Sequence, residues 1–378
     1  MGQSLDKPRH IEAQVLADTH GNVVVLGTRD CSLQRRNQKL VEEAPAPFLS
    51  DAQRERIHTA ARDICAAAGY VSAGTVEFLL SQSGAISFLE VNTRLQVEHP
   101  VTEQTTGVDL VVEQLRVADG LPLSLTQTPA PLGHSFEFRI NAEDVGRGFL
   151  PTPGPVQRFD APSGPGVRLD TGVQTGSAVP GTFDSLMAKL IVTGATREQA
   201  LARARRALRE FQIEGVASVL PFHRAVIDHP DFVGADGFKV HTRWIESDFA
   251  TPLAAAVRAV PVADTSLLRT AIEIDGRRVQ LGLPAVLLQG LAAAGGQGAA
   301  AAPAEAAVDA AAVTSPIAGN LHAWKVADGD TVQEGDVIAV MEAMKMEMQV
   351  TAHRAGRVAL AAAAGTAQAL GAVIARIA

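Results

Sequence analysis

Three side chains with hard oxygen ligands lie close together in the first quarter of the sequence. Glu77 falls in one apolar, strand-like stretch, and Glu90 and Asn92 fall in the next, after a short Ser/Gly turn. This pattern predicts a β-hairpin over 74–92 whose two arms bring the three side chains together. Two carboxylates and an amide oxygen suit Mg²⁺, which in turn bridges nucleotide phosphates. The alternative is that these are ordinary surface side chains of two strands.

A dense polar run, NTRLQVEHPVTE, follows directly over 92–103. It places several charged or amide side chains in one predicted strand-to-helix passage: Arg94, Gln96, Glu98, His99 and Glu103. Folding alone does not explain this density beside a metal-type hairpin, so we expect chemistry here. We expect His99, which precedes a proline, to serve the turn or its packing.

A second polar run, over 29–47, is rich in cations and amides. It follows neither a strand nor a helix period, and we expect it to carry part of the chemistry. The alternative is an ordinary solvated loop.

Near the C-terminus, Lys345 lies between Met344 and Met346. The segments on either side read as short strands, which predicts a hairpin with this lysine at an exposed tip. The flanking sequence repeats at a spacing of 36 residues, since Gly329 matches Gly365 and Gly335 matches Gly371. Two copies of one small β unit predict a quasi-twofold β-sandwich with the lysine at the joint.

The 378 residues are 47% hydrophobic and 20% charged, which indicates two or three globular domains. The net charge of −8 gives no reason to expect nucleic-acid or membrane binding. Two cysteines, Cys31 and Cys65, cannot form a disulfide framework and indicate a reducing compartment. No stretch resembles a signal peptide or a membrane span, so we expect a cytoplasmic protein.

Strands and helices that position the polar runs are expected to pack as an α+β domain over 1–249. The predicted hairpin 11–16/23–26 begins it, and the predicted helices are 51–68 (capped by Ser50), 107–118, 197–211, 221–227 and 242–247. We expect a connector over 250–289 with a small β-hairpin at 266–285, followed by an Ala/Gly/Pro tether over 290–312. The last domain is then 313–378.

Residues 313–378 resemble the biotin carboxyl carrier domain, and the resemblance implies that Lys345 carries biotin. Lipoyl domains share this all-β fold and also use a hairpin lysine, but they typically lack methionine on both sides of it. Lipoylation is therefore the lesser alternative.

Residues 6–249 resemble the second half of biotin carboxylase, an ATP-grasp enzyme. The matching stretches are RDCSLQRRNQKLVEEAPAP, GTVEFL, FLEVNTRLQVEHPVTE, FRINAED, FLPTPG and FDSLMAKL. As a whole, the chain resembles the α subunit of bacterial acyl-CoA carboxylases of the actinobacterial type.

The resemblance implies a role for each matching residue. The metal, Mg²⁺ or Mn²⁺, would be held by Glu77, Glu90 and Asn92. ATP would contact His10, Gln34, Asn37, Glu77, Glu90 and His241, although many relatives have histidine where Asn37 stands. The bicarbonate and biotin pocket would be lined by Lys39, Arg94, Gln96, Val97 and Arg139.

Within that pocket, the resemblance implies that Glu98 is the general base that deprotonates bicarbonate. Attack on ATP would give carboxyphosphate, and Arg139 would stabilise the enolate-like oxygen of biotin. The catalytic residues would be Lys39, Arg94, Glu98 and Arg139.

The family has a further N-terminal region with a glycine-rich lid and phosphate-binding lysines, whereas this sequence joins the family pattern at 6–10. We therefore expect an N-terminally truncated chain that needs the other half of the nucleotide clamp from elsewhere. The alternative is a non-catalytic biotinylated carrier with a remnant carboxylase domain. The resemblance also implies a separate carboxyltransferase β subunit, a biotin protein ligase and an oligomer.

Overall fold

The structure, a computed structural model, describes residues 5–234, 237–256, 267–274, 277–284, 309, 311–317, 319–343 and 346–378. Lys345, Met344 and most of the predicted tether lie outside the described residues. The chain divides into two compact units, Met1–Ala256 and Val257–Ala378. In the part of the chain that the structure describes, no helix is long and apolar enough to cross a membrane.

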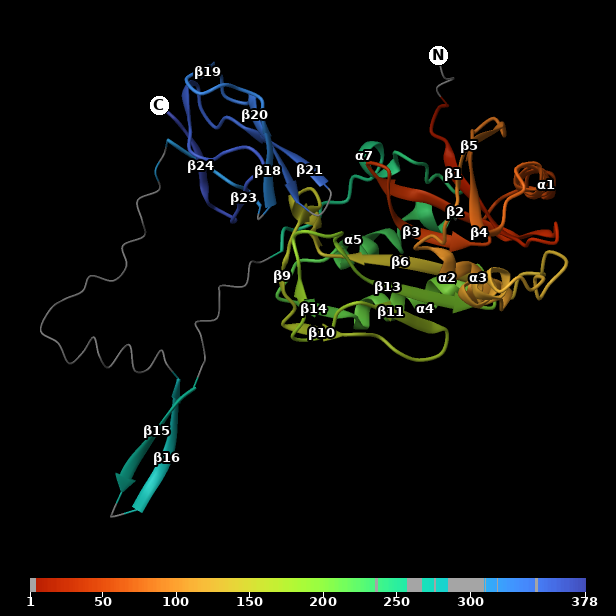
Figure 1. The fold of residues 1–378 in the computed structure, drawn as a ribbon, viewed down its shortest axis with the longest axis horizontal. Helices are drawn as coiled ribbons and strands as arrows, with labels where there is room; N and C mark the ends of the chain where they lie inside the picture. The colour runs from red at the N-terminus through yellow and green to blue at the C-terminus, as the bar shows by residue number, and fades with distance from the viewer. Residues whose placement is uncertain are drawn as a thin grey trace, which may run out of the picture. The chain divides into compact units, whose positions relative to one another are not determined.

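The first unit is built on one antiparallel sheet of eight strands in the order β11-β13-β6-β3-β2-β1-β4-β5 (Figure 1). The strands are β1 (Arg9–Ala17), β2 (Val23–Arg35), β3 (Gln38–Ala44), β4 (Ser72–Leu80), β5 (Ile86–Asn92), β6 (His134–Asn141), β11 (Val167–Thr171) and β13 (Leu186–Gly194). Three short strand pairs accompany it: β7 (Glu143–Asp144) with β8 (Leu150–Pro151), β9 (Gly154–Pro155) with β12 (Ala178–Val179), and β10 (Arg158–Asp160) with β14 (Gln212–Glu214).

The helices of the first unit follow most of the predicted ranges. They are α1 (Asp51–Ala67), α2 (His99–Thr106), α3 (Leu110–Ala118), α4 (Arg197–Glu210), α5 (Leu220–Val226), α6 (Pro230–Val233) and α7 (Trp244–Ser247), with a 3-10 turn η1 (Val145–Arg147). Ser50 caps α1 through a reciprocal capping box with Gln53, as predicted for an N-cap. The predicted start of the next long helix at Gly107 is wrong, because Gly107 ends α2 in a left-handed conformation and Asp109 caps α3.

The two faces of the sheet have different characters. Ile11, Ala13 and Val15 of β1 form one apolar core with Ile57 and other residues of α1. Because side chains alternate along a strand, the intervening Glu12 and Gln14 belong to the opposite face. Both of these polar side chains are fully buried. Around these two residues the second face is a buried polar layer, whereas Leu16, at the end of β1, packs in a second apolar core with Leu26 and Leu110.

Most of the polar run over 29–47 is a β-hairpin in the middle of the sheet, so the alternative of a solvated loop is wrong. Strand β2 continues to Arg35 and β3 begins at Gln38. The two turn residues, Arg36 and Asn37, have φ values of 48° and 64°, a left-handed conformation that asparagine tolerates well. Nearly all of both strands is buried on both faces, so the sequence carries no polar–apolar alternation to mark them.

The second unit contains the predicted hairpin, β15 (Leu267–Ile274) paired with β16 (Arg277–Pro284). The rest is two four-stranded sheets, β17-β24-β22-β19 and β21-β20-β18-β23. Their strands are β17 (Ala312–Thr314), β18 (Gly319–Trp324), β19 (Thr331–Val332), β20 (Val337–Ala343), β21 (Met346–Thr351), β22 (Gly356–Leu360), β23 (Ala367–Gln368) and β24 (Val373–Ile377).

These two sheets confirm the predicted repeat. Replacing β17, β18, β19 and β20 by β21, β22, β23 and β24, and the reverse, converts the strand order of one sheet into that of the other. The equivalent glycines Gly335 and Gly371 have φ values of 92° and 79°, so both halves turn in the same way. Ala343 pairs with Met346, which makes β20 and β21 a hairpin whose two connecting residues include Lys345.

Candidate active site on the polar face of the sheet

The register of the central strands lines up charged residues side by side. Glu77 of β4 lies opposite Glu90 of β5 on one side and Glu12 of β1 on the other. Glu12 lies in turn opposite Arg29 of β2. Directly opposed side chains of neighbouring strands have Cβ atoms about 5 Å apart, so these four residues form a continuous row of ionisable groups across the strands. It forms because each residue sits at an alternate, same-face position of its strand.

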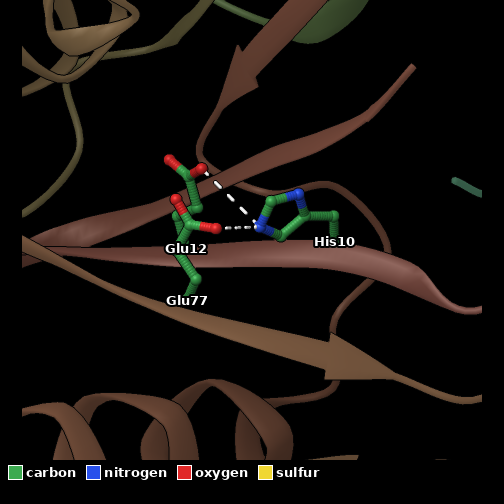
Figure 2. A group of neighbouring side chains, drawn as sticks. All are labelled: His10, Glu12 and Glu77. Atoms are coloured by element: carbon green, nitrogen blue, oxygen red, sulfur yellow. Dashed lines mark hydrogen bonds and ion pairs between the residues drawn. The ribbon is translucent and has the colours of Figure 1, made fainter. Parts of the chain in front are cut away.

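The imidazole of His10 points its Nε2 toward two of these carboxylates, which lie on the same side of the ring (Figure 2). Its Nε2 is 2.7 Å from Glu77 Oε2 and 3.8 Å from Glu12 Oε1. Burial alone would lower the pKa of His10, but the hydrogen bond to Glu77 and the charge of Glu12 raise it above its ordinary value. Burial likewise opposes ionisation of Glu77, yet His10 and Lys39 lower its pKa to about 2. The two carboxylates therefore stabilise the cationic form of the histidine.

Glu98, at the start of α2, is held by two cations. Lys39 Nζ donates to Glu98 Oε1 at 2.8 Å, and Arg139 Nη2 donates to Glu98 Oε2 at 2.7 Å. Burial and Glu12 would raise the pKa of Glu98, but Lys39 and Arg139 outweigh them and lower it. Glu98 is thus a buried carboxylate, 2% exposed, held between two cations.

Lys39 and Arg139 join this carboxylate to the rest of the polar face. Lys39 also donates to Glu12 and, at 3.3 Å, to Glu77 Oε1. Arg139 Nε donates to Glu42 Oε1 at 2.6 Å. Both cations are mostly buried, and their anionic neighbours keep the pKa of each above its usual range despite that burial. They would stay charged while binding an anion.

Arg29 lies at the centre of the polar face and is completely buried. Its guanidinium donates to Glu12 at 2.9 and 3.0 Å and to Gln96 Oε1 at 2.8 Å. Further bonds reach Gln14, Thr75 and Thr102. Because Arg29 occupies the oxygen of the Gln96 amide, the amide nitrogen faces Glu77 Oε1 and donates to it at 2.8 Å. Arg29 thus fixes which way the amide points.

The three candidate metal ligands are brought together on β4 and β5. Asn92 Nδ2 donates to Glu77 Oε1 at 2.8 Å and to Glu90 Oε1 at 3.1 Å. Carboxylate and amide oxygens are ligands that fit Mg²⁺, but here the amide nitrogen of Asn92, and not its oxygen, faces the two carboxylates. His10, Glu12 and Glu77 form a second group whose ligand atoms lie within 4.8 Å of one another. In both groups the buried carboxylates already accept hydrogen bonds from neighbouring side chains.

Family models match three parts of the chain. Residues 1–126 match the carbamoyl-phosphate synthase L chain ATP-binding domain, 137–247 the biotin carboxylase C-terminal domain, and 311–377 the domain described as biotin-requiring enzyme. The biotin-dependent acyl-coenzyme A carboxylase alpha3 subunit of Mycobacterium leprae is 56% identical over 99% of this chain and 65% of its own length.

Most of the chain is similar in sequence and in fold to biotin carboxylases. A biotin carboxylase of Nostoc is 52% identical over 61% of this chain and 52% of its own length. The crystal structure of Campylobacter jejuni biotin carboxylase, solved as an ATP-analogue complex, matches with a TM-score of 0.62 and 40% identity over 65% of this chain and 54% of that one. The chain therefore spans about half to two thirds of the length of these relatives.

Other residues predicted from the family resemblance lie at the edge of this cluster or away from it. Arg94 is exposed, and its recorded hydrogen bond is a 3.4 Å contact with the Leu95 carbonyl. The Val97 carbonyl accepts from Lys189 Nζ at 2.9 Å. Gln34 is buried opposite Lys39, whereas Asn37 is exposed in the turn.

His241 contacts Asp248 at 2.6 Å and lines a cavity of about 540 Å³. Lys7, Arg9 and Trp244 line the same cavity. His241 therefore belongs to a different group of contacts from His10. The backbone N–H of Thr242 nevertheless donates a hydrogen bond to the carbonyl oxygen of Pro8, near the start of β1.

Four buried members of the polar face were not singled out from the sequence. They are Glu12, Arg29, Glu42 and Glu137. One signal was present for Glu12, because a charge inside the predicted strand 11–16 is costly to bury unless another buried charge pairs with it. The partner, however, is set by strand pairing and is not visible in the sequence.

Proposed function

We propose that this chain is the α subunit of a biotin-dependent acyl-CoA carboxylase, which carboxylates biotin carried on Lys345 at the expense of ATP and bicarbonate. The observation that carries the proposal is Glu98, a buried carboxylate held between Lys39 and Arg139. Bicarbonate is a small anion that must lose a proton before it can attack a phosphoryl group. A base flanked by two cations meets both needs.

In this proposal Glu98 takes the bicarbonate proton while Lys39 and Arg139 hold the resulting anion. Arg94, Gln96 and Val97 complete the pocket once the substrate is bound. Glu77, Glu90 and Asn92 would hold Mg²⁺ or Mn²⁺, which would supply positive charge to the ATP phosphates. Arg139 would later stabilise negative charge on the biotin ureido oxygen.

Substrates and partners follow from the same proposal. His10, Gln34, Asn37 and His241 would contribute to the nucleotide site. A biotin protein ligase would modify Lys345, and a carboxyltransferase β subunit would transfer the carboxyl group to acyl-CoA. We place the protein in the cytoplasm and expect it to act as an oligomer.

The test is ADP release from MgATP by the purified chain, with dependence on bicarbonate and free biotin. Free biotin makes the assay independent of modification at Lys345. Glu98→Gln should lower the rate about 10²- to 10⁴-fold, the usual contribution of a general base. Glu103→Gln is the matched control, because Glu103 lies in the same polar run but pairs with Arg168 at 2.9 Å. No turnover by the folded wild type would contradict the proposal and leave the role of a biotinylated carrier.

A further inference from the structure

Two glutamates lie side by side next to Arg139. Glu42 of β3 and Glu137 of β6 are direct cross-strand partners, and both have 0% exposure. Opposed residues of neighbouring antiparallel strands have Cβ atoms about 5 Å apart on the same face. Two carboxyl groups therefore share one solvent-free region of the polar face.

The pair has too few hydrogen-bond donors for two carboxylates. Glu42 Oε1 accepts from Arg139 Nε at 2.6 Å. Within the described residues, Glu42 Oε2 and both carboxyl oxygens of Glu137 have no hydrogen-bond partner. A buried carboxylate without donors is costly, and two adjacent like charges raise that cost.

The neighbouring cations are already committed elsewhere. The charged groups facing the pair are Lys39 of β3, Glu98 at the start of α2, Arg139 of β6 and Lys189 of β13. Lys39 donates to Glu12, Glu77 and Glu98, while Lys189 donates to the Val97 carbonyl. Among the described residues, only Arg139 donates a hydrogen bond to the pair, and it also donates one to Glu98.

We propose that Glu42 and Glu137 hold a single proton between them and together position Arg139 toward Glu98. With one negative charge behind it, Arg139 remains divided between Glu42 and Glu98. A second charge would draw the guanidinium away from Glu98 and from any anion bound there. Burial raises the pKa of Glu42 to about 7, although Arg139 opposes the shift. Burial and the charge of Glu42 raise the pKa of Glu137 well above its ordinary value.

The shared proton can be seen directly by infrared spectroscopy of the full chain at pH 7. The difference spectrum between wild type and Glu137→Gln should contain the carbonyl band of a protonated carboxylic acid. Glu43→Gln is the control, because Glu43 is the next residue of β3 but pairs with Arg197 and His134, and its pKa is lowered despite burial. A Glu137→Gln difference spectrum without the acid band would overturn the proposal.

Unfolding equilibria give a second measurement that does not depend on spectroscopic assignment. A group whose pKa is raised on folding binds a proton in the folded state that the unfolded chain has released. Stability from this proton is present below the ordinary glutamate pKa and is lost as pH rises toward 7 and beyond. Relative to Glu137→Gln, the wild-type unfolding constant should rise up to about tenfold per pH unit between pH 5 and 7. Parallel curves would contradict a bound proton.

The positioning role rests on the proposed function, and its test is the pH profile of biotin carboxylation. Glutamine mimics the neutral acid, so Glu137→Gln should retain activity at pH 7 and lose the alkaline fall caused by ionisation of the pair. An unchanged alkaline fall would overturn the positioning role. If the wild type has no carboxylase activity, the infrared and unfolding results still decide whether the proton is bound.

Discussion

Glu77 and Glu90 are neighbours with the same proposed role and opposite surroundings. Glu77 is 4% exposed and contacts His10, Lys39, Asn92 and Gln96. Glu90 is exposed, and its recorded hydrogen bond comes from Asn92. Substituting each glutamate by glutamine therefore separates a metal-binding role from a structural role.

We predict that Glu77→Gln lowers the free energy of unfolding by about 3 kcal/mol, because it leaves buried cations without their counter-charge. Glu90→Gln should change it by less than about 0.5 kcal/mol, as is usual at the surface. Urea unfolding without added metal measures both. Equal losses in the two variants would show that the buried network does not depend on Glu77.

At the residue scale, the sequence was informative where motifs were dense. Glu77, Glu98, Lys39 and Arg139 come from four separate segments, and the structure brings them into one connected set of ion pairs. Arg29 and the Glu42–Glu137 pair were missed. Their importance depends on which strand lies beside which, and register is a property of the assembled sheet.

At the scale of elements, Arg29 links strands to a helix. Its bonds run from β2 to Glu12 of β1, Thr75 of β4 and Thr102 of α2. It also bonds Gln96 in the segment that leads into α2. The short helix α2, which begins with Pro at its second position, is thus anchored to the polar face at two points.

We predict that Arg29→Lys costs about 3–5 kcal/mol, because one ammonium cannot replace the planar fork and leaves buried acceptors unpaired. Arg168→Lys is the comparison: Arg168 contacts Glu103 of α2 and Asp170, but its side chain is 34% exposed. Its loss should stay below about 1 kcal/mol. Hydrogen exchange should also accelerate in α2 of Arg29→Lys. Unchanged α2 protection in a folded variant would refute the anchoring role.

Elements were predictable where caps and turns are local, as at Ser50, and less so where burial hides the pattern. Strands β2 and β3 have charged and polar side chains on a face that is fully covered, so neither alternation nor hydrophobicity marks them. The predicted start of α3, at residue 107, is three residues early for a different reason. Gly107 was included in the predicted helix 107–118, but it takes a left-handed conformation and ends α2.

On the scale of the whole molecule, the chain consists of two compact units with separate cores. The carrier-type unit was predictable because its repeat appears as glycines at a fixed spacing. Each glycine performs a local task, a turn with positive φ, that few other residues perform cheaply. Equivalent positions in the two halves have equivalent surroundings, so the same substitution at two equivalent glycines should change the stability by the same amount.

Gly335 and Gly371 are equivalent glycines at which this expectation can be tested. Both have positive φ, and a Cβ at either would meet nothing within 4 Å, so substitution by alanine costs only backbone strain. We predict that Gly335→Ala and Gly371→Ala each destabilise the second unit by about 1 kcal/mol. Gly356→Ala should cost more, because its Cβ would lie 2.5 Å from the Ala378 carbonyl oxygen. Calorimetry of the full chain should show one transition moving and the transition of the first unit staying in place. If both transitions move together, the two units do not unfold independently and the division of the chain into separate cores is incorrect.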